Sequence, residues 1–74
     1  MTPAQCRAAR ALIGMTQPQL AEAAEFGLST IVDFEKERRE ISVVAFMAIQ
    51  HALEMAGVEF IAENGGGAGV RLRK

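Results

Sequence analysis

Apolar residues recur at helical spacing in successive segments of the chain, and polar capping motifs separate these segments. In the first segment, residues 3–13, Cys6, Ala9 and Ile13 fall on one face of a helix. The preceding motif TPAQ has the form of a capping box with proline at the first helical position, and Gly14 is a typical stop. The pattern therefore predicts a first helix over residues 3–13.

The same device opens a second helix. The motif TQPQ predicts a helix over residues 17–24, and the turn EFGL follows it. A third helix then begins after Gly27 or Ser29 and ends near residue 36 or 37, with Ile31 and Phe34 facing the core. Two short helices joined by a tight turn are thus expected in the middle of the chain.

The last third of the chain contains a long apolar segment and then a change of period. Ser42 predicts a cap for a fourth helix that runs to about Met55 and ends at Gly57. This helix is apolar around most of its girth, so either the C-terminal segment or a second protomer must cover it. The segments GVEFI and VRLRK predict a β-hairpin, with Asn64-Gly65 as its turn signal, whereas a disordered glycine-rich tail is the alternative.

These elements predict a mainly α fold, a compact four-helix domain with a short C-terminal β-hairpin. The helical domain covers residues 1–57, and the hairpin, residues 58–74, is the expected dimerisation element. The chain of 74 residues is long enough for one small domain, and such a small core is commonly extended by oligomerisation. The apolar residues expected in a homodimer interface are Phe46, Met47, Phe60, Val70 and Leu72.

Composition and charge say more about the cellular compartment of the protein than about its function. The net charge is −1 and the pI is about 5.7, so overall charge does not favour nucleic acid, although Arg38, Arg39 and the ending RLRK form local basic groups. The chain shows no signal peptide, and its longest apolar stretch, ISVVAFMAI, is too short for a bilayer. Cys6 is the only cysteine, which excludes an internal disulfide and favours a reducing, cytoplasmic setting. Its thiol is either reactive or a small buried hydrophobe.

No enzymatic chemistry is predicted. His51 is the only histidine, and no cysteine or histidine cluster has metal-ligand spacing. The glycines of NGGGAG lack the lysine and the strand-to-helix context of a phosphate loop. We therefore expect no metal, no cofactor and no membrane.

The stretches RAARALIGMTQPQLAEAA and STIVDFEKERR resemble the helix-turn-helix domain of phage Cro and lambda-type repressors and of the XRE family of bacterial regulators. The resemblance covers about residues 3–56. It implies a Cro/lambda-repressor-like fold and a sequence-specific DNA-binding transcriptional regulator, a repressor. The implied partner is double-stranded DNA with an inverted-repeat operator, bound by a homodimer that inserts the third helix into the major groove.

The resemblance also implies roles for particular residues. Base reading falls to the third helix, at Leu28, Ser29, Thr30, Val32 and Asp33. The DNA phosphates are held by Gln17, Lys36, Arg38 and Arg39. Arg10 and Glu35 form an ion pair between the first and third helices.

Some features depart from this family pattern. Glu25 and Glu37 stand where many relatives have glycine. At Glu25 the carboxylate is expected to force a different backbone shape, and both departures bear on how the domain docks on DNA. The third helix is also poor in side chains that hydrogen-bond bases. The competing interpretation is a protein-interaction module on the same fold, an antitoxin or an anti-activator. It gains support if Lys36, Arg38 and Arg39 form ion pairs with Glu37 and Glu40.

Overall fold

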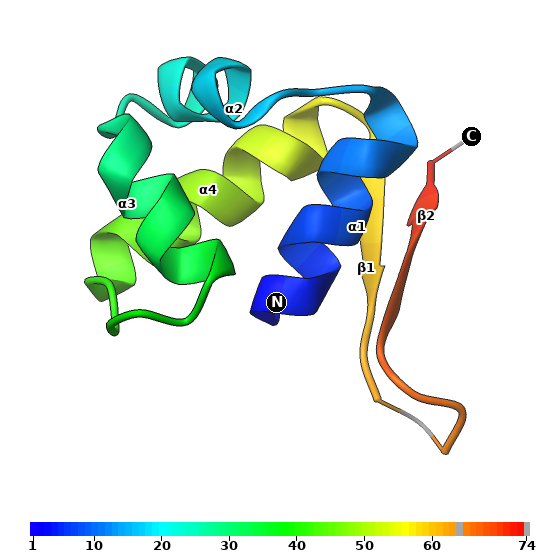
Figure 1. Ribbon diagram of the computed structural model, residues 1–74. Coiled ribbons are helices and arrows are strands. Elements are labelled where there is room, and N and C mark those ends of the chain that lie inside the picture. Colours follow the sequence, from blue (N-terminus) through cyan, green and yellow to red (C-terminus); the bar gives the residue numbers. More distant parts are fainter. Residues whose placement is uncertain (64, 74) are drawn as a thin grey trace.

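The described chain folds into four helices followed by one two-stranded antiparallel sheet (Figure 1). The computed structural model describes residues 1–63 and 65–73. The elements are α1 (Pro3–Ile13), α2 (Gln17–Ala24), α3 (Leu28–Glu35), α4 (Val43–Met55), β1 (Val58–Ile61) and β2 (Gly69–Leu72). The mainly helical architecture and the C-terminal hairpin predicted from the sequence are confirmed.

Side-chain caps fix the ends of the first two helices. The Thr2 hydroxyl accepts a hydrogen bond from the Gln5 amide at 3.1 Å, and the Gln5 side chain accepts one from the Thr2 amide at 2.8 Å. Thr16 and Gln19 make the same reciprocal pair at the start of α2. These bonds satisfy amide groups that have no partner within the helix, which is why the capping boxes predict both boundaries correctly.

Two glutamates adopt the left-handed backbone conformation that glycine favours. Glu25 ends α2 with φ 61°, and Glu37 follows α3 with φ 57°. The turn at Glu25 is closed by the Phe26 amide, which donates to the Ala21 carbonyl at 3.1 Å. Both residues therefore form a left-handed turn of the kind that glycine favours, at the steric cost that a Cβ imposes.

The third helix is slightly shorter than predicted. Gly27, not Ser29, is its N-cap, and the helix ends at Glu35, with Lys36 as C-cap. The Arg38 amide then donates to the Asp33 carbonyl at 2.9 Å, so the chain turns away from the helix axis just after Glu35. This turn directs the segment that follows α3 across the outside of the helix.

The hairpin packs onto its own chain. Its strands pair with Val58 opposite Leu72 and Phe60 opposite Val70. The Gln5 side-chain amide donates to the carbonyls of Ile61 at 3.1 Å and Gly69 at 2.9 Å, which ties α1 to both strands. The disordered-tail alternative is wrong for the described strands, whereas the predicted Asn64-Gly65 turn includes Asn64, which lies outside the described residues.

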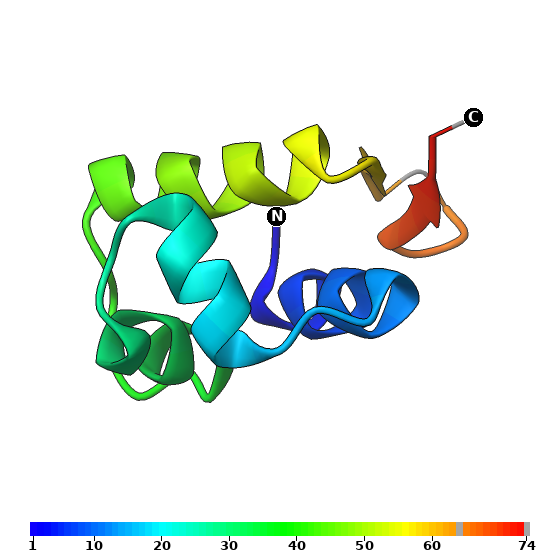
Figure 2. The same ribbon diagram turned by 90° about the horizontal axis from the view of Figure 1, so that it is seen from above.

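The core lies between α4 on one side and α1 and α3 on the other (Figure 2). Fully buried aliphatic side chains fill it, from α2, α3, α4 and β1: Leu20, Ile31, Ile49, Leu53 and Val58. The hairpin lies at the opposite end of the molecule from α3 in both views. The outer surface of α3 is therefore left uncovered by the hairpin.

No helix among the described residues has the length and apolar character needed to cross a membrane.

Candidate functional site

The first turn of α3 projects from the two-helix unit that α2 and α3 form. Leu28 keeps 46% of its surface exposed, and Ser29 is exposed beside it. Val32 and Asp33 follow one helical turn later on the same face and are half-buried, as is Thr30. Four of the five predicted base-reading residues thus share one outer face of α3, and Thr30 lies to its side.

The predicted phosphate-binding cations lie next to this face. Lys36 is exposed, and the side chains of Arg38 and Arg39 keep 59% and 53% of their surface exposed. The Arg39 Nε donates to the Asp33 carboxylate at 2.8 Å, and an Arg38 nitrogen lies 4.0 Å from the other oxygen. Asp33 therefore gathers both arginines at the outer face of α3. The ion pairs described for these arginines involve Asp33, and none involves Glu37 or Glu40.

A buried carboxylate joins the three N-terminal helices on the opposite side of α3. Glu35 is 1% exposed, and Arg10 binds it through two nitrogens at 2.6 and 2.7 Å. The Gln17 amide donates to the same carboxylate at 3.0 Å, and the Cys6 thiol donates at 3.2 Å. The Arg7 guanidinium also donates to the Glu35 carbonyl. This is the pair of Arg10 and Glu35 expected from the sequence, within a larger hydrogen-bonded cluster.

The electrostatics of this cluster keep it charged and inert. Burial alone would raise the pKa of Glu35, but hydrogen bonds from Arg10, Cys6 and Gln17 outweigh it, so the pKa is lowered. The hydrogen bond to Glu35 raises the pKa of Arg10. Burial, with the adjacent carboxylate, raises the pKa of the Cys6 thiol well above its usual range. Cys6 is fully buried and stays protonated, which favours a structural residue over a reactive thiol.

The Gln17 side chain points into the fold. Its side-chain amide donates to Glu35 inside the fold, so it is not directed outward to a phosphate. The reason is that the buried carboxylate needs donors for its remaining lone pairs. At this end of α2, Pro18 has no amide hydrogen and the Gln19 amide is capped by Thr16, so the Gln17 backbone amide is the donor left for an anion.

Sequence reasoning missed three longer-range hydrogen-bonding roles: those of Cys6 and Gln17 toward Glu35, and that of Gln5 toward the hairpin. For Cys6 a signal existed, because Cys6 and Arg10 lie four residues apart and hence on one face of α1. For Gln17 and Gln5 no local pattern shows that the side chains reach α3 and the hairpin, respectively.

The outward surface of α4 carries large apolar side chains that no described element covers. We call it the α4 outer face: Val43, Val44, Met47 and Met55, which are 63–73% exposed. Beside them, Met47, Gln50, His51 and Glu54 line a shallow hollow of about 330 Å³. Patches of this kind on a small protein mark contact surfaces.

The residues predicted for dimerisation divide into two groups. Met47 and Leu72 are 63% and 48% exposed and face outward. Phe60 and Val70 are half-buried against the core of their own chain, and the Phe46 ring contacts Phe34 edge to face. Only the first group offers large apolar area to a second protomer.

No family model matches the sequence, and no curated protein matches it. No group of three or more metal-ligating side chains comes together among the described residues. Three surface features of the described residues have now been set out: the outer face of α3, the arginines beside it and the α4 outer face.

Proposed function

We propose that the protein is a sequence-specific DNA-binding transcriptional regulator, a repressor, of the Cro/lambda-repressor-like helix-turn-helix type. The observation that carries this proposal is the placement of Arg38 and Arg39 beside the exposed first turn of α3. A projecting short helix flanked by cations fits the major groove, since the cations lie where the phosphates of the groove walls run. The overall acidic charge does not oppose this, because Lys36, Arg38 and Arg39 are exposed together and the surface contacts of Arg38 and Arg39 with Asp33 can be exchanged for phosphates.

In this proposal α3 enters the major groove with its first turn toward the bases. Leu28 and Val32 contact thymine methyl groups, and the Ser29 hydroxyl donates to or accepts from a base edge. Lys36, Arg38 and Arg39 bind the flanking phosphates. The backbone amide of Gln17, at the positive end of the α2 dipole, binds another phosphate.

Asp33 gives the arginines an alternative partner in the absence of DNA. Its carboxylate holds Arg39 at 2.8 Å on the surface. An exposed pair of this kind contributes about 1 kcal/mol or less, so a phosphate can replace the carboxylate at low cost. Once released, Asp33 can accept a hydrogen bond from a cytosine amino group.

A homodimer places two copies of α3 on one face of the duplex. Its interface is the α4 outer face, extended by Leu72. A helix of 13 residues is about 20 Å long, too short to supply a standard interface alone, so the hairpin end must contribute. Two-fold symmetry then requires an inverted-repeat operator whose half-sites lie about 34 Å apart.

Footprinting of the protein on its own upstream DNA tests this proposal. We expect two protected major-groove segments about one helical turn apart on one face of the duplex. Replacing thymines with uracil within each half-site should weaken binding, because it removes the methyl groups that Leu28 and Val32 contact. Protection of a single segment, or binding with no sequence preference at any salt concentration, would contradict the model of a symmetric operator.

A matched pair of surface variants tests the dimer within the same experiment. Met47→Glu on the α4 outer face should give a monomer in sedimentation at tens of micromolar (order of magnitude) and abolish the paired footprint. Leu12→Glu, at an apolar residue of α1 that is 43% exposed, should leave both unchanged. A monomeric wild-type protein at that concentration would contradict the proposed interface.

A protein-interaction module on the same fold is the second candidate function. The observation that favours it is the apolar α4 outer face, together with the pairing of both surface arginines with Asp33. The two candidates separate at low salt, where cation-rich DNA-binding surfaces bind most tightly. Absence of DNA binding at low salt would favour the protein-interaction candidate.

A further inference from the structure

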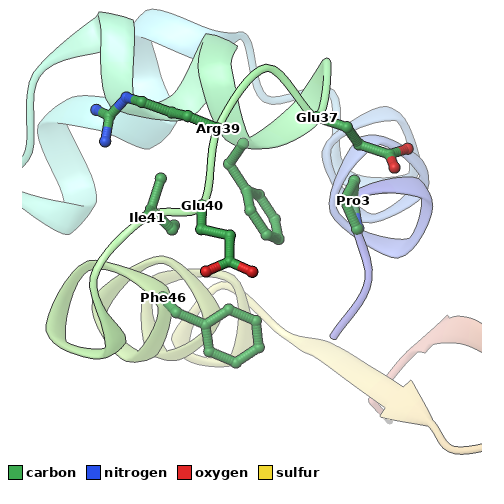
Figure 3. A pocket seen from close by; sticks show the side chains of 7 residues that line it. Pro3, Glu37, Arg39, Glu40, Ile41 and Phe46 are labelled. Atoms are coloured by element: carbon green, nitrogen blue, oxygen red, sulfur yellow. The ribbon is translucent and has the colours of Figure 1, made fainter.

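A cavity of about 480 Å³ opens between the start of α1, the end of α3, the loop of residues 36–42 and the start of α4 (Figure 3). The residues that line it are Pro3, Phe34, Glu37, Arg39, Glu40, Ile41 and Phe46. None of them belongs to the outer face of α3 or to the α4 outer face. The cavity is therefore a separate feature of the molecule.

The floor of the cavity is apolar and partly aromatic. Phe34 and Phe46 pack edge to face, with ring centroids 5.9 Å apart and an interplanar angle of 76°. Ile41 and Pro3 add aliphatic surface. Aromatic ring faces attract cations as well as apolar groups, so this floor suits a ligand that has both.

The charges around the opening are mainly negative. Glu37 and Glu40 each contribute a carboxylate, and neither has an ion-pair partner among residues 1–63 and 65–73. Figure 3 shows the Glu40 side chain reaching into the space in front of Phe46, and Glu37 on the side of Pro3. The Arg39 guanidinium points away from the cavity, toward Asp33, which binds it at 2.8 Å. The cavity thus presents two unpaired carboxylates, and its one cation is neutralised elsewhere.

We propose that this cavity binds a small organic ammonium ion, a primary amine with an aromatic or branched aliphatic body. The apolar body rests on Phe34, Phe46 and Ile41, and the ammonium group binds between the carboxylates of Glu37 and Glu40. A small molecule suits this open cavity, because its volume of about 480 Å³ is that of small-molecule sites.

The bound amine is also placed to change DNA binding, a consequence that rests on the proposed function. Glu37 and Glu40 belong to the same loop as Arg38 and Arg39, the proposed phosphate contacts. Two carboxylates beside these arginines repel DNA phosphates, and an ammonium ion that neutralises them removes this repulsion. The amine therefore raises the affinity for DNA.

Calorimetric titration of the whole chain with three matched probes tests the site without DNA. The probes are 2-phenylethylamine, which is a cation at neutral pH, the neutral 2-phenylethanol and the anionic 3-phenylpropanoate. We expect the amine to bind with a Kd of about 1 mM or tighter, and at least about tenfold more tightly than the other two. In NMR spectra its shifts should centre on Phe34, Phe46 and residues 37–41. Equal affinity for the three probes, or shifts centred elsewhere, would overturn the proposal.

Variants that remove one negative charge locate the ammonium group. Glu37→Gln and Glu40→Gln should each weaken amine binding about threefold to tenfold, because each keeps the shape of the side chain. Glu22→Gln, at an exposed carboxylate of α2 outside the cavity, should leave the affinity unchanged. Unchanged affinity in both cavity variants would overturn the site.

A DNA arm separates the site from its consequence. Saturating 2-phenylethylamine should raise DNA affinity of the wild type and have a smaller effect on the Glu37→Gln/Glu40→Gln variant. Amine binding without a change in DNA affinity would overturn the coupling alone. A protein that binds amine but no DNA would overturn the proposed function and leave the site standing.

Discussion

Asp33 and Glu35 lie two residues apart on α3 and bind arginines on opposite sides of the helix. They differ in how deeply they are buried and in how many hydrogen bonds they accept. Glu35 faces inward, where Arg10 grips it with two nitrogens and its side chain is 2% exposed. Asp33 faces outward, where Arg39 binds it through one nitrogen and keeps more than half its surface in solvent. The same pair of chemical groups is thus part of the fold on one side and an exchangeable contact on the other.

The two carboxylates differ in the number of hydrogen-bond donors around them and in their exposure to water. The Glu35 carboxylate accepts hydrogen bonds from three side chains, and no buried side-chain nitrogen or oxygen in the described residues lacks a partner. Removing a donor leaves the buried Glu35 carboxylate with fewer partners, and removing Glu35 leaves the Arg10 guanidinium, which is 19% exposed, without its anion. At Asp33, water or a DNA phosphate can take the place of either partner.

The largest expected effect is the loss of stability when the inner carboxylate is neutralised. Glu35→Gln should lower the free energy of unfolding by about 3 kcal/mol, because it leaves the partly buried Arg10 guanidinium without its anionic partner. Asp33→Asn is the matched control on the same helix and should change it by less than about 0.5 kcal/mol. Urea denaturation followed by circular dichroism measures both. Equal losses would remove the distinction between the two carboxylates.

The inner pair should also make stability depend on pH. The pKa of Glu35 is lowered in the folded state, so its contribution is complete above its ordinary value of 4.5 and is lost as the pH falls through the lowered pKa. We expect the free energy of unfolding of the wild type to decline below about pH 4.5. The Glu35→Gln variant should decline less steeply over the same range. Parallel curves would show that Glu35 does not carry this dependence.

Glu25 and Glu37 flank α3 in the left-handed conformation, and replacing them should change stability less and in the opposite direction. Glu25→Gly and Glu37→Gly should each raise the free energy of unfolding by about 0.5–1 kcal/mol, because glycine relieves the steric cost of positive φ. Glu22→Gly, inside α2, should instead lower it by about 1 kcal/mol. Thermal unfolding of the three variants compares them directly. A loss of stability at Glu25 and Glu37 would show that their side chains contribute more than the backbone costs.

Local sequence signals predicted the elements of the fold well. The capping boxes at Thr2 and Thr16 satisfy amides three residues away, so they act within the segment that encodes them. The end of α3 was less well predicted, because the left-handed turn at Glu37 is one that glycine usually signals. Spacing along the chain could not give the tie between Gln5 and the hairpin, since it joins residues more than fifty positions apart.

In the candidate site, too, local spacing could be predicted from the sequence, whereas contacts between distant segments could not. The shared outer face of α3 follows from helical spacing, so the sequence placed Ser29, Val32 and Asp33 together. The inward turn of Gln17 depends on where a buried carboxylate from another helix lies, and no local pattern reports that position. The pairing of Asp33 with both arginines depends on the turn after α3, which brings the chain back across the helix.

The outer arginines offer the most direct test of the central claim, that the surface pair is exchangeable and serves DNA. The measurement is the salt dependence of DNA affinity for the wild type and for Arg38→Ala/Arg39→Ala, with Asp33→Asn as a control that keeps both cations. We predict that the double variant weakens binding to all sequences and reduces the slope of log K against log salt by about one for each lost phosphate contact. Asp33→Asn should keep the slope. An unchanged affinity and slope in the double variant would contradict the account.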